Sequence, residues 1–169
     1  MKTIDVFIVM GSASDASKAE PAIAALKGFG VPFDAAVCSA HRSPKKLAAL
    51  VASAEKRGCL VFIALAGKAA HLPGVVAAHT AKPVIGVPID TPMMGLDSLL
   101  SIAQMPPGVP VATVGVDAGK NAALLAIQML ALSDAKLAKK LADYKAALGA
   151  DVAKQNAETR KKLRIPKLP

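Results

Sequence analysis

Aromatic residues are scarce in this chain of 169 residues, which has no tryptophan and one tyrosine. Proteins that bind single-stranded nucleic acid stack the bases on aromatic side chains, so this shortage argues against such a platform. The net charge of +9 does not reverse that conclusion. Ten of the lysines and arginines, against four acidic residues, lie from Asp134 onward, in a stretch typical of a solvated helix. We therefore expect no nucleic-acid partner.

Cysteines and long hydrophobic runs are also scarce. Cys38 and Cys59 are the only two cysteines, and they have neither the spacing of a metal site nor a secretory context for a disulfide. The apolar run near the amino terminus is short and contains Asp5, so it predicts neither a membrane span nor a signal peptide. We expect a cytoplasmic protein that binds no metal and no membrane.

Two familiar nucleotide-binding motifs are missing. The loop Gly11–Asp15 (GSASD) follows an apolar run and precedes a helix, which is where backbone N–H groups attract phosphate. It has neither the G-x-G-x-x-G spacing of a dinucleotide site nor the lysine of a P-loop. Asp15 has two interpretations: it caps the helix, which is the commoner role, or it accepts hydrogen bonds from ribose hydroxyls.

What the chain does contain is a regular alternation of short apolar runs and helical segments. The runs predict strands over residues 4–10, 31–37, 60–64, 83–87 and 109–116. This order predicts an α/β fold, a three-layer αβα sandwich of the flavodoxin or Rossmann type with a five-stranded parallel sheet. We expect a single domain over residues 1–169.

The last helix is predicted to begin near Asp134, to be capped by Ser133 and to run to about residue 163. Such a helix is too long for one face of a small domain. We therefore expect residues 134–169 to form a helical extension that packs on a neighbouring subunit.

The segment Ser39–Pro44 (SAHRSP) joins a predicted strand to a predicted helix. Ser43 followed by Pro44 is typical of an N-cap and the first helical position, so His41 and Arg42 lie beside the amino end of the helix. Histidine titrates near neutral pH and arginine grips phosphate, which together suit acid/base chemistry on a phosphorylated substrate. Taken alone, the segment is more typical of a solvated surface loop with a helix-capping Ser-Pro.

A third loop, residues 65–74, is rich in small side chains, which lets backbone approach a ligand closely. It contains His71, which on its own is more typical of a structural histidine than of a catalytic one.

Together, these loops resemble the PurE family of purine biosynthesis. The family carries Gly-Ser-x-Ser-Asp, Ser-Ala-His-Arg and Ala-Ala-His-Leu-Pro-Gly loops, and this chain has residues 11–15 (GSASD), 39–42 (SAHR) and 69–74 (AAHLPG). The resemblance continues through residues 83–88, 96–106, 108–114 and 121–125. It implies carboxylation chemistry on 5-aminoimidazole ribonucleotide with no metal or organic cofactor, in a homo-octamer.

The resemblance also implies roles for single residues. His41 would be the general acid/base, Arg42 and the hydroxyls of Ser12 and Ser14 would bind phosphate, and Asp15 would bind ribose. The remaining substrate-binding positions that it implies are Ser39, Gly67, Ala70, His71 and Leu72, with His71 beside the migrating carboxylate.

The family has two branches. One is a 5-(carboxyamino)imidazole ribonucleotide mutase, and the other adds free CO2 directly. The segment 69–74 is similar to the mutase branch and favours that activity, whereas Lys68 replaces a glycine of the mutases and stands where the carboxylases have arginine. Direct carboxylation is therefore the alternative, and a non-catalytic nucleotide-binding module is a remote one.

Overall fold

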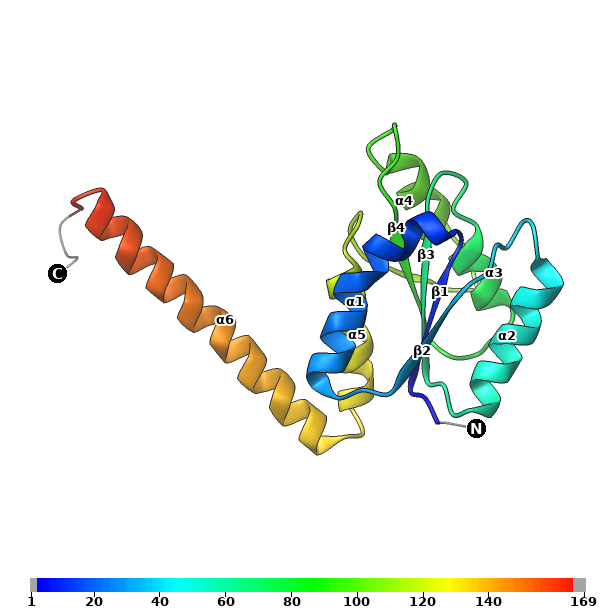
Figure 1. The fold of residues 1–169 in the computed structure, drawn as a ribbon, viewed down its shortest axis with the longest axis horizontal. Helices are drawn as coiled ribbons and strands as arrows, with labels where there is room; N and C mark the ends of the chain where they lie inside the picture. The colour runs from blue at the N-terminus through cyan, green and yellow to red at the C-terminus, as the bar shows by residue number, and fades with distance from the viewer. Residues whose placement is uncertain (1–2, 166–169) are drawn as a thin grey trace. The chain divides into compact units, whose positions relative to one another are not determined.

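The computed structural model describes residues 3–165, and the chain divides into two compact units, residues 1–130 and 131–169. The ends of the predicted domain and of the predicted extension, residues 1–2 and 166–169, therefore lie outside the described part. The first unit contains β1 (Val6–Met10), η1 (Ala13–Asp15), α1 (Ala16–Phe29), β2 (Phe33–Val37), α2 (Pro44–Lys56), β3 (Val61–Ala66), α3 (Leu72–Ala78), β4 (Val84–Pro88), α4 (Leu96–Ala103) and β5 (Ala112–Thr113). Helix α5 (Gly119–Ala131) follows β5 (Figure 1).

All five strands are parallel, in the order β2-β1-β3-β4-β5. Strands β1, β3 and β4 are buried along their whole length, which explains why they read as unbroken apolar runs rather than as alternating ones. The predicted α/β fold with a five-stranded parallel sheet is confirmed. In such a sheet the carboxyl ends of all strands meet at one edge, where ligands bind.

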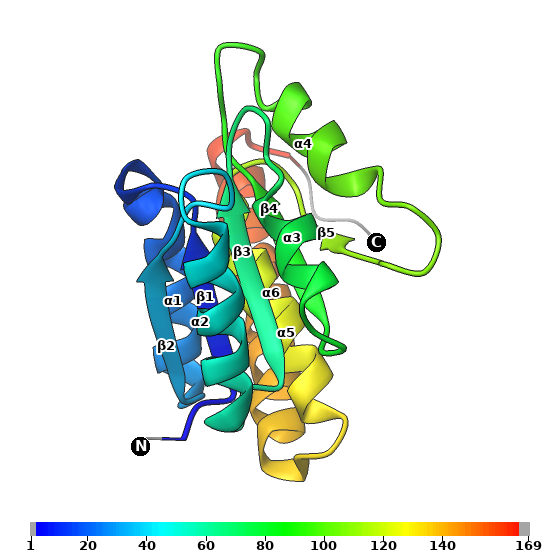
Figure 2. The same cartoon turned by 90° about the vertical axis from the view of Figure 1, so that its right-hand side faces the viewer.

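Helices cover both faces of the sheet. Helices α1 and α5 lie on one face, and α2 and α3 lie on the other (Figures 1 and 2). One core cluster joins Phe7 of β1 and Phe62 of β3 to Leu47 of α2, Val76 of α3 and Ile102 of α4. The two phenylalanine rings meet edge to face at a centroid distance of 6.2 Å. Apart from Cys38 and Cys59 the rest of the cluster is aliphatic, and burying each Val, Leu or Ile side chain contributes about 1.5–3 kcal/mol.

The fifth strand is much shorter than predicted. Only Ala112–Thr113 pairs as a strand with β4, instead of residues 109–116. Pro110 has no N–H to donate to a ladder, so pairing starts after it. Beyond Thr113 the chain still follows β4, because Val114 N donates to Gly86 O at 3.1 Å and Asp117 N donates to Pro88 O at 2.8 Å.

The second unit is built around α6 (Ala135–Lys162), a helix of 28 residues that is about 42 Å long at 1.5 Å per residue. The predicted cap was wrong: Asp134, not Ser133, occupies the N-cap position. Its Oδ1 accepts hydrogen bonds from the N–H groups of Lys136 and Leu137 at 2.9 and 3.0 Å. A carboxylate satisfies these amide groups and also favours the positive end of the helix dipole.

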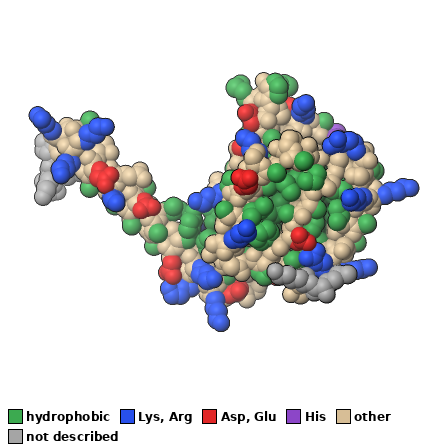
Figure 3. Space-filling model, in the orientation of Figure 1, with side chains coloured by type: hydrophobic (Ala, Val, Ile, Leu, Met, Phe, Trp, Pro, Cys, Tyr) green, Lys and Arg blue, Asp and Glu red, His purple; other side chains and the backbone are tan. Residues whose placement is uncertain are grey.

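The surface of the first unit carries apolar side chains at the edge of the sheet. Figure 3 shows hydrophobic side chains gathered between α1 and α2, over β2. Four of the five residues of this edge strand are half-buried, and Val37 is 46% exposed. None of the helices within residues 3–165 combines the length and the apolar character needed to cross a membrane.

Candidate active site

A cavity of about 490 Å³ lies at the carboxyl edge of the sheet. Its walls are the four loops that follow β2, β1, β3 and β4, which are neighbours in the sheet. The lining residues are Gly11, Ser12, Ser14, Asp15, Ser39, Ala40, His41, Arg42, Ala66, Gly67, Lys68, Ala69, His71, Leu72, Ile89, Asp90 and Thr91. The structure therefore brings together all but one of the predicted site residues, and the exception is Ala70.

The loop after β1 is held by its own polar groups. Ser12 is the N-cap of the short helix η1, and its amide donates to Asp15 Oδ2 at 3.0 Å. Ser14 Oγ donates to Ser12 Oγ at 3.0 Å. Asp15 is only 8% exposed. Its carboxylate thus stabilises the loop, which is the capping role, although the helix that it caps is η1 rather than α1.

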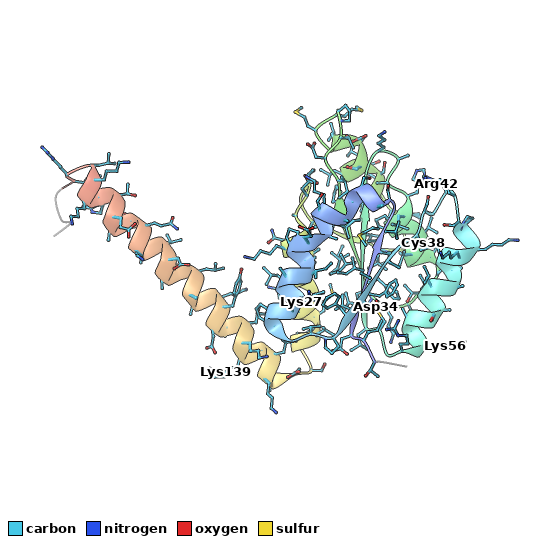
Figure 4. The ribbon with its side chains drawn as sticks, in the orientation of Figure 1. Lys27, Asp34, Cys38, Arg42, Lys56 and Lys139 are labelled. Carbon is cyan, nitrogen blue, oxygen red and sulfur yellow. The ribbon has the colours of Figure 1, made fainter. Side chains whose placement is uncertain are left out.

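The loop after β2 presents His41 and Arg42 at the surface of the cavity. Arg42 N donates to Ser39 Oγ at 3.2 Å, which folds the turn back on itself. Ser43 occupies the N-cap position of α2 and Pro44 the first helical position, as predicted, but the Ser43 side chain does not cap the helix. Its hydroxyl donates instead to Ser39 O at 3.0 Å and so closes the turn. Figure 4 shows Arg42 on this loop, beyond the end of β2.

His41 and His71 come from different loops and are in direct contact. His41 Nε2 lies 2.8 Å from His71 Nδ1, and the two rings are nearly perpendicular at 86° with centroids 4.9 Å apart. One of these nitrogens must carry the proton and the other must accept it. Both side chains are exposed to the cavity. The pair can therefore deliver a proton to a bound ligand and take one back.

The loop after β3 is made of small residues and one cation. Gly67 lies close to the next loop, since a Cβ there would be 3.3 Å from Ile89 Cβ and 3.5 Å from Thr91 Cγ2. Lys68 adopts a left-handed backbone conformation with φ of 58°, which is uncommon for a residue other than glycine. Ala70 is only 1% exposed and packs in the core cluster behind the cavity, whereas Leu72 is buried and lines it.

The loop after β4 supplies lining residues that the sequence analysis did not identify. Ile89, Asp90 and Thr91 form this wall. The signal was the position of Asp90 and Thr91 directly after a strand that adjoins β3. Thr91 Oγ1 donates to Asp97 Oδ1 at 2.7 Å, and this hydrogen bond is the main reason that the pKa of Asp97 is lowered, with Lys68 as a smaller electrostatic cause.

Neither of the two cysteines, Cys38 and Cys59, lines the cavity. Both cysteines are free and buried, and burial raises the pKa of the Cys59 thiol to about 11, so this thiol stays protonated. Within residues 3–165 no three His, Cys, Asp or Glu side chains are grouped so that they could hold a metal ion. The chemistry available at the cavity is thus proton transfer by the two histidines, anion binding by hydroxyls and two cations, and enclosure by small side chains.

Comparison with known proteins gives three findings. A sequence model described as AIR carboxylase matches residues 5–151. The N5-carboxyaminoimidazole ribonucleotide mutase of Methanocaldococcus jannaschii is 56% identical over 140 residues, which are 83% of this chain and 87% of that protein. The phosphoribosylaminoimidazole carboxylase of Saccharomyces cerevisiae is 51% identical over 140 residues, which are 82% of this chain and 24% of that protein.

A solved structure gives the same result for the fold. The crystal structure of Treponema denticola PurE superposes with a TM-score of 0.84 at 27% sequence identity, and the match covers 90% of this chain and 96% of that one.

Proposed function

Because the chain belongs to the AIR carboxylase family, as the resemblance of its three loops predicted, we propose that it is a 5-(carboxyamino)imidazole ribonucleotide mutase of purine biosynthesis. The observation that carries the proposal is the contact of His41 with His71 inside a cavity walled by Gly67 and Ala69. A module that only binds nucleotides would not need a proton-transfer pair beside its ligand.

The reaction moves a carboxylate from the exocyclic nitrogen of the substrate to the adjacent ring carbon. The bond from nitrogen to the carboxylate carbon breaks, CO2 is released, and His41 gives a proton to the nitrogen. The ring carbon then attacks the same CO2, and His41 removes the proton that this carbon carries. One proton is given and one is regained, so a single histidine can serve both steps.

The cavity makes recapture of CO2 an intramolecular event. Gly67 and Ala69 leave room for a small molecule beside the ring and exclude water, which raises the effective concentration of CO2 there. His71 contacts His41 through Nδ1, and we assign its Nε2 to the migrating carboxylate. Ala70, behind the cavity, would act by packing rather than by touching the substrate.

The other loops would hold the ribonucleotide. We assign the phosphate to Arg42 and the hydroxyls of Ser12 and Ser14, all of which line the cavity. Asp15 would accept hydrogen bonds from ribose, with one oxygen also holding Ser12 N. Ser39 and Leu72 would complete the pocket.

Direct carboxylation by the same site is the second candidate, because Lys68 lines the cavity and the Saccharomyces relative is named a carboxylase. The identities favour the mutase: this chain is 56% identical to the Methanocaldococcus mutase and 51% identical to the Saccharomyces carboxylase.

We further propose a homo-octamer in the cytoplasm, in which residues 134–169 pack on a neighbouring subunit. The apolar surface over β2 and the exposed side chains of Met93, Met94, Leu96 and Leu100 support assembly, since patches of this kind mark interfaces. Two free cysteines fit a reducing compartment.

Replacement of His41 tests the catalytic assignment. We expect His41→Asn to lose at least about a hundredfold in kcat, the usual size of a general acid/base contribution, while nucleotide affinity is kept. Arg42→Ala is the matched variant from the same loop and should mainly lose affinity for the nucleotide. Near-normal turnover by His41→Asn would contradict the assignment.

A further inference from the structure

Asp117 lies in the loop between β5 and α5, and it does not line the cavity. We infer that Asp117 is a positioning residue that holds the wall formed by Asp90 and Thr91 and thereby keeps CO2 in the cavity until it is recaptured. This inference rests on the proposed mutase function.

Asp117 bonds to the chain on both sides of Ile89. Its Oδ1 accepts a hydrogen bond from Asp90 N at 3.0 Å, and its own N–H donates to Pro88 O at 2.8 Å. These bonds fix the backbone where it leaves β4 and enters the wall of the cavity. Such a double contact sets the direction of the loop, because neither peptide unit can rotate without losing a bond.

The loop that Asp117 holds is the one that closes on Gly67. Asp90 Oδ1 accepts from Thr91 N at 3.0 Å, and Thr91 Oγ1 donates to Asp97 Oδ1 at 2.7 Å. With these bonds made, Ile89 Cβ and Thr91 Cγ2 lie 3.3 and 3.5 Å from the position that a Cβ on Gly67 would take. The wall therefore packs closely against Gly67, on the small-residue side of the cavity where the mechanism confines CO2.

Asp117 is itself held in place from a third element. Lys18 Nζ of α1 donates to Asp117 Oδ2, so that the two carboxylate oxygens serve two different partners. The pKa of Lys18 is raised, first by this hydrogen bond and then by the charge of Asp117. Gly119, two residues further on, lets α5 approach α1, since a Cβ there would lie 2.5 Å from Lys18 O.

The backbone at Asp117 is left-handed, with φ of 56°. Residues other than glycine seldom adopt this conformation, although Asp and Asn tolerate it better than most. The cost of this conformation is offset here by the four hydrogen bonds that the residue makes. A useful substitution at Asp117 therefore removes the carboxylate without adding backbone strain. Alanine would remove the carboxylate but would also be strained in this conformation.

The test uses three variants. Asp117→Gly removes the carboxylate and accepts the left-handed backbone without strain. Asp117→Asn keeps a side-chain oxygen for Asp90 N but loses the charge and the hydrogen bond from Lys18, because its amide nitrogen cannot accept one. Asp34→Asn is the matched control, because Asp34 also forms an ion pair between elements, with Arg57 at 2.6 Å. Asp34 lies near the start of β2, whereas Arg42 and the cavity lie beyond the end of that strand (Figure 4).

Each variant is given the N-carboxylated ribonucleotide, and two products are measured: the ring-carboxylated nucleotide and the free aminoimidazole nucleotide left when CO2 escapes. The second rate is corrected for decay of the substrate without enzyme, and both are divided by the folded fraction from circular dichroism. The ratio of the two products reports escape of CO2, which a purely structural defect would not change.

We expect Asp117→Gly to lose about tenfold in kcat/KM, the size of one lost hydrogen bond to a charged group, and to release more free aminoimidazole nucleotide per product. Asp117→Asn should lie closer to the wild type, and Asp34→Asn should match the wild type in both measurements. An unchanged product ratio in Asp117→Gly, or equal damage in Asp117→Gly and Asp117→Asn, would overturn the inference. No ring-carboxylated product from the wild type would overturn the proposed function instead.

Discussion

His41 and His71 are 30 positions apart in the sequence, yet their Nε2 and Nδ1 atoms are 2.8 Å apart. This contact gives the His41 ring a fixed orientation, which suits the acid/base role proposed for it. It also explains why His71, which looks structural when considered alone, belongs to the candidate site.

Asp34, which does not line the cavity, tests how much an ion pair contributes to the stability of the fold. Hydrogen bonding to Arg57 is the main cause that lowers the pKa of Asp34. The folded state therefore gains stability from this carboxylate above its ordinary pKa of about 4, and loses it as the pH falls below that value. Because 44% of the Asp34 side chain is exposed, the gain is at most about 1 kcal/mol.

We predict that Asp34→Asn lowers the free energy of unfolding at pH 7 and that the difference from the wild type shrinks as the pH is taken from 5 to 3. Denaturant titrations of both proteins at each pH measure this difference in the free energy of unfolding. The amide oxygen can still accept the hydrogen bond from Ala35 N, whereas the amide nitrogen cannot accept one from Arg57, so the variant removes the charge and the bond to Arg57 together. A difference that stays constant over this range would contradict the prediction.

At this scale, sequence patterns identified side chains in the loops that follow β1, β2 and β3. His41, Arg42 and Asp15 each stand beside a motif, and each lines the cavity. Sequence patterns did not identify the roles of Asp90 and Asp117, because these roles come from a hydrogen bond between residues 27 positions apart, from Asp90 N to Asp117 Oδ1. No local pattern encodes such a contact.

Helices and strands are placed by close approaches as well as by hydrophobic patterns. Gly119 begins α5 where a Cβ would lie 2.5 Å from the backbone oxygen of Lys18 in α1. A backbone atom in a helix cannot easily move aside. We predict that Gly119→Ala lowers the free energy of unfolding by about 1–3 kcal/mol, the usual cost of overpacking.

Gly28 is the matched control for that substitution. It lies within α1, and a Cβ there would have nothing within 4 Å. Gly28→Ala should therefore stabilise the protein by about 0.5–1 kcal/mol through helix propensity. Thermal and chemical denaturation measure both variants, and equal stabilities for Gly28→Ala and Gly119→Ala would show that α5 does not approach α1 in this way.

The sequence predicted the order and type of the elements better than their ends. Buried strands β1, β3 and β4 are strongly apolar, so their positions followed from hydrophobicity alone. Strand β5 was overestimated because Val109 and residues 114–116 have strand-like composition, whereas Pro110 limits the pairing. The cap of α6 was assigned to Ser133 because Ser and Asp are equally good caps, and only the observed contacts of the Asp134 carboxylate decide between them.

For the whole molecule, we predict an assembly larger than a monomer. The first unit exposes Met94 at 84% and Met93 at 60%, which a monomer would leave in water. Size-exclusion chromatography with light scattering should give the mass of an octamer of 17.2 kDa chains. Removal of residues 134–169 should reduce the assembly if this extension packs on a neighbour, and a monomeric mass for the full chain would contradict the prediction.

The central claim is that this chain transfers a carboxylate within one substrate rather than taking up free CO2. The most direct measurement offers the enzyme the N-carboxylated ribonucleotide without added bicarbonate and, separately, the aminoimidazole ribonucleotide with abundant bicarbonate. Appearance of the ring-carboxylated product is followed in both assays. We predict efficient turnover only with the first substrate. Preference for the second would contradict the mutase assignment and give Lys68 a part in direct carboxylation.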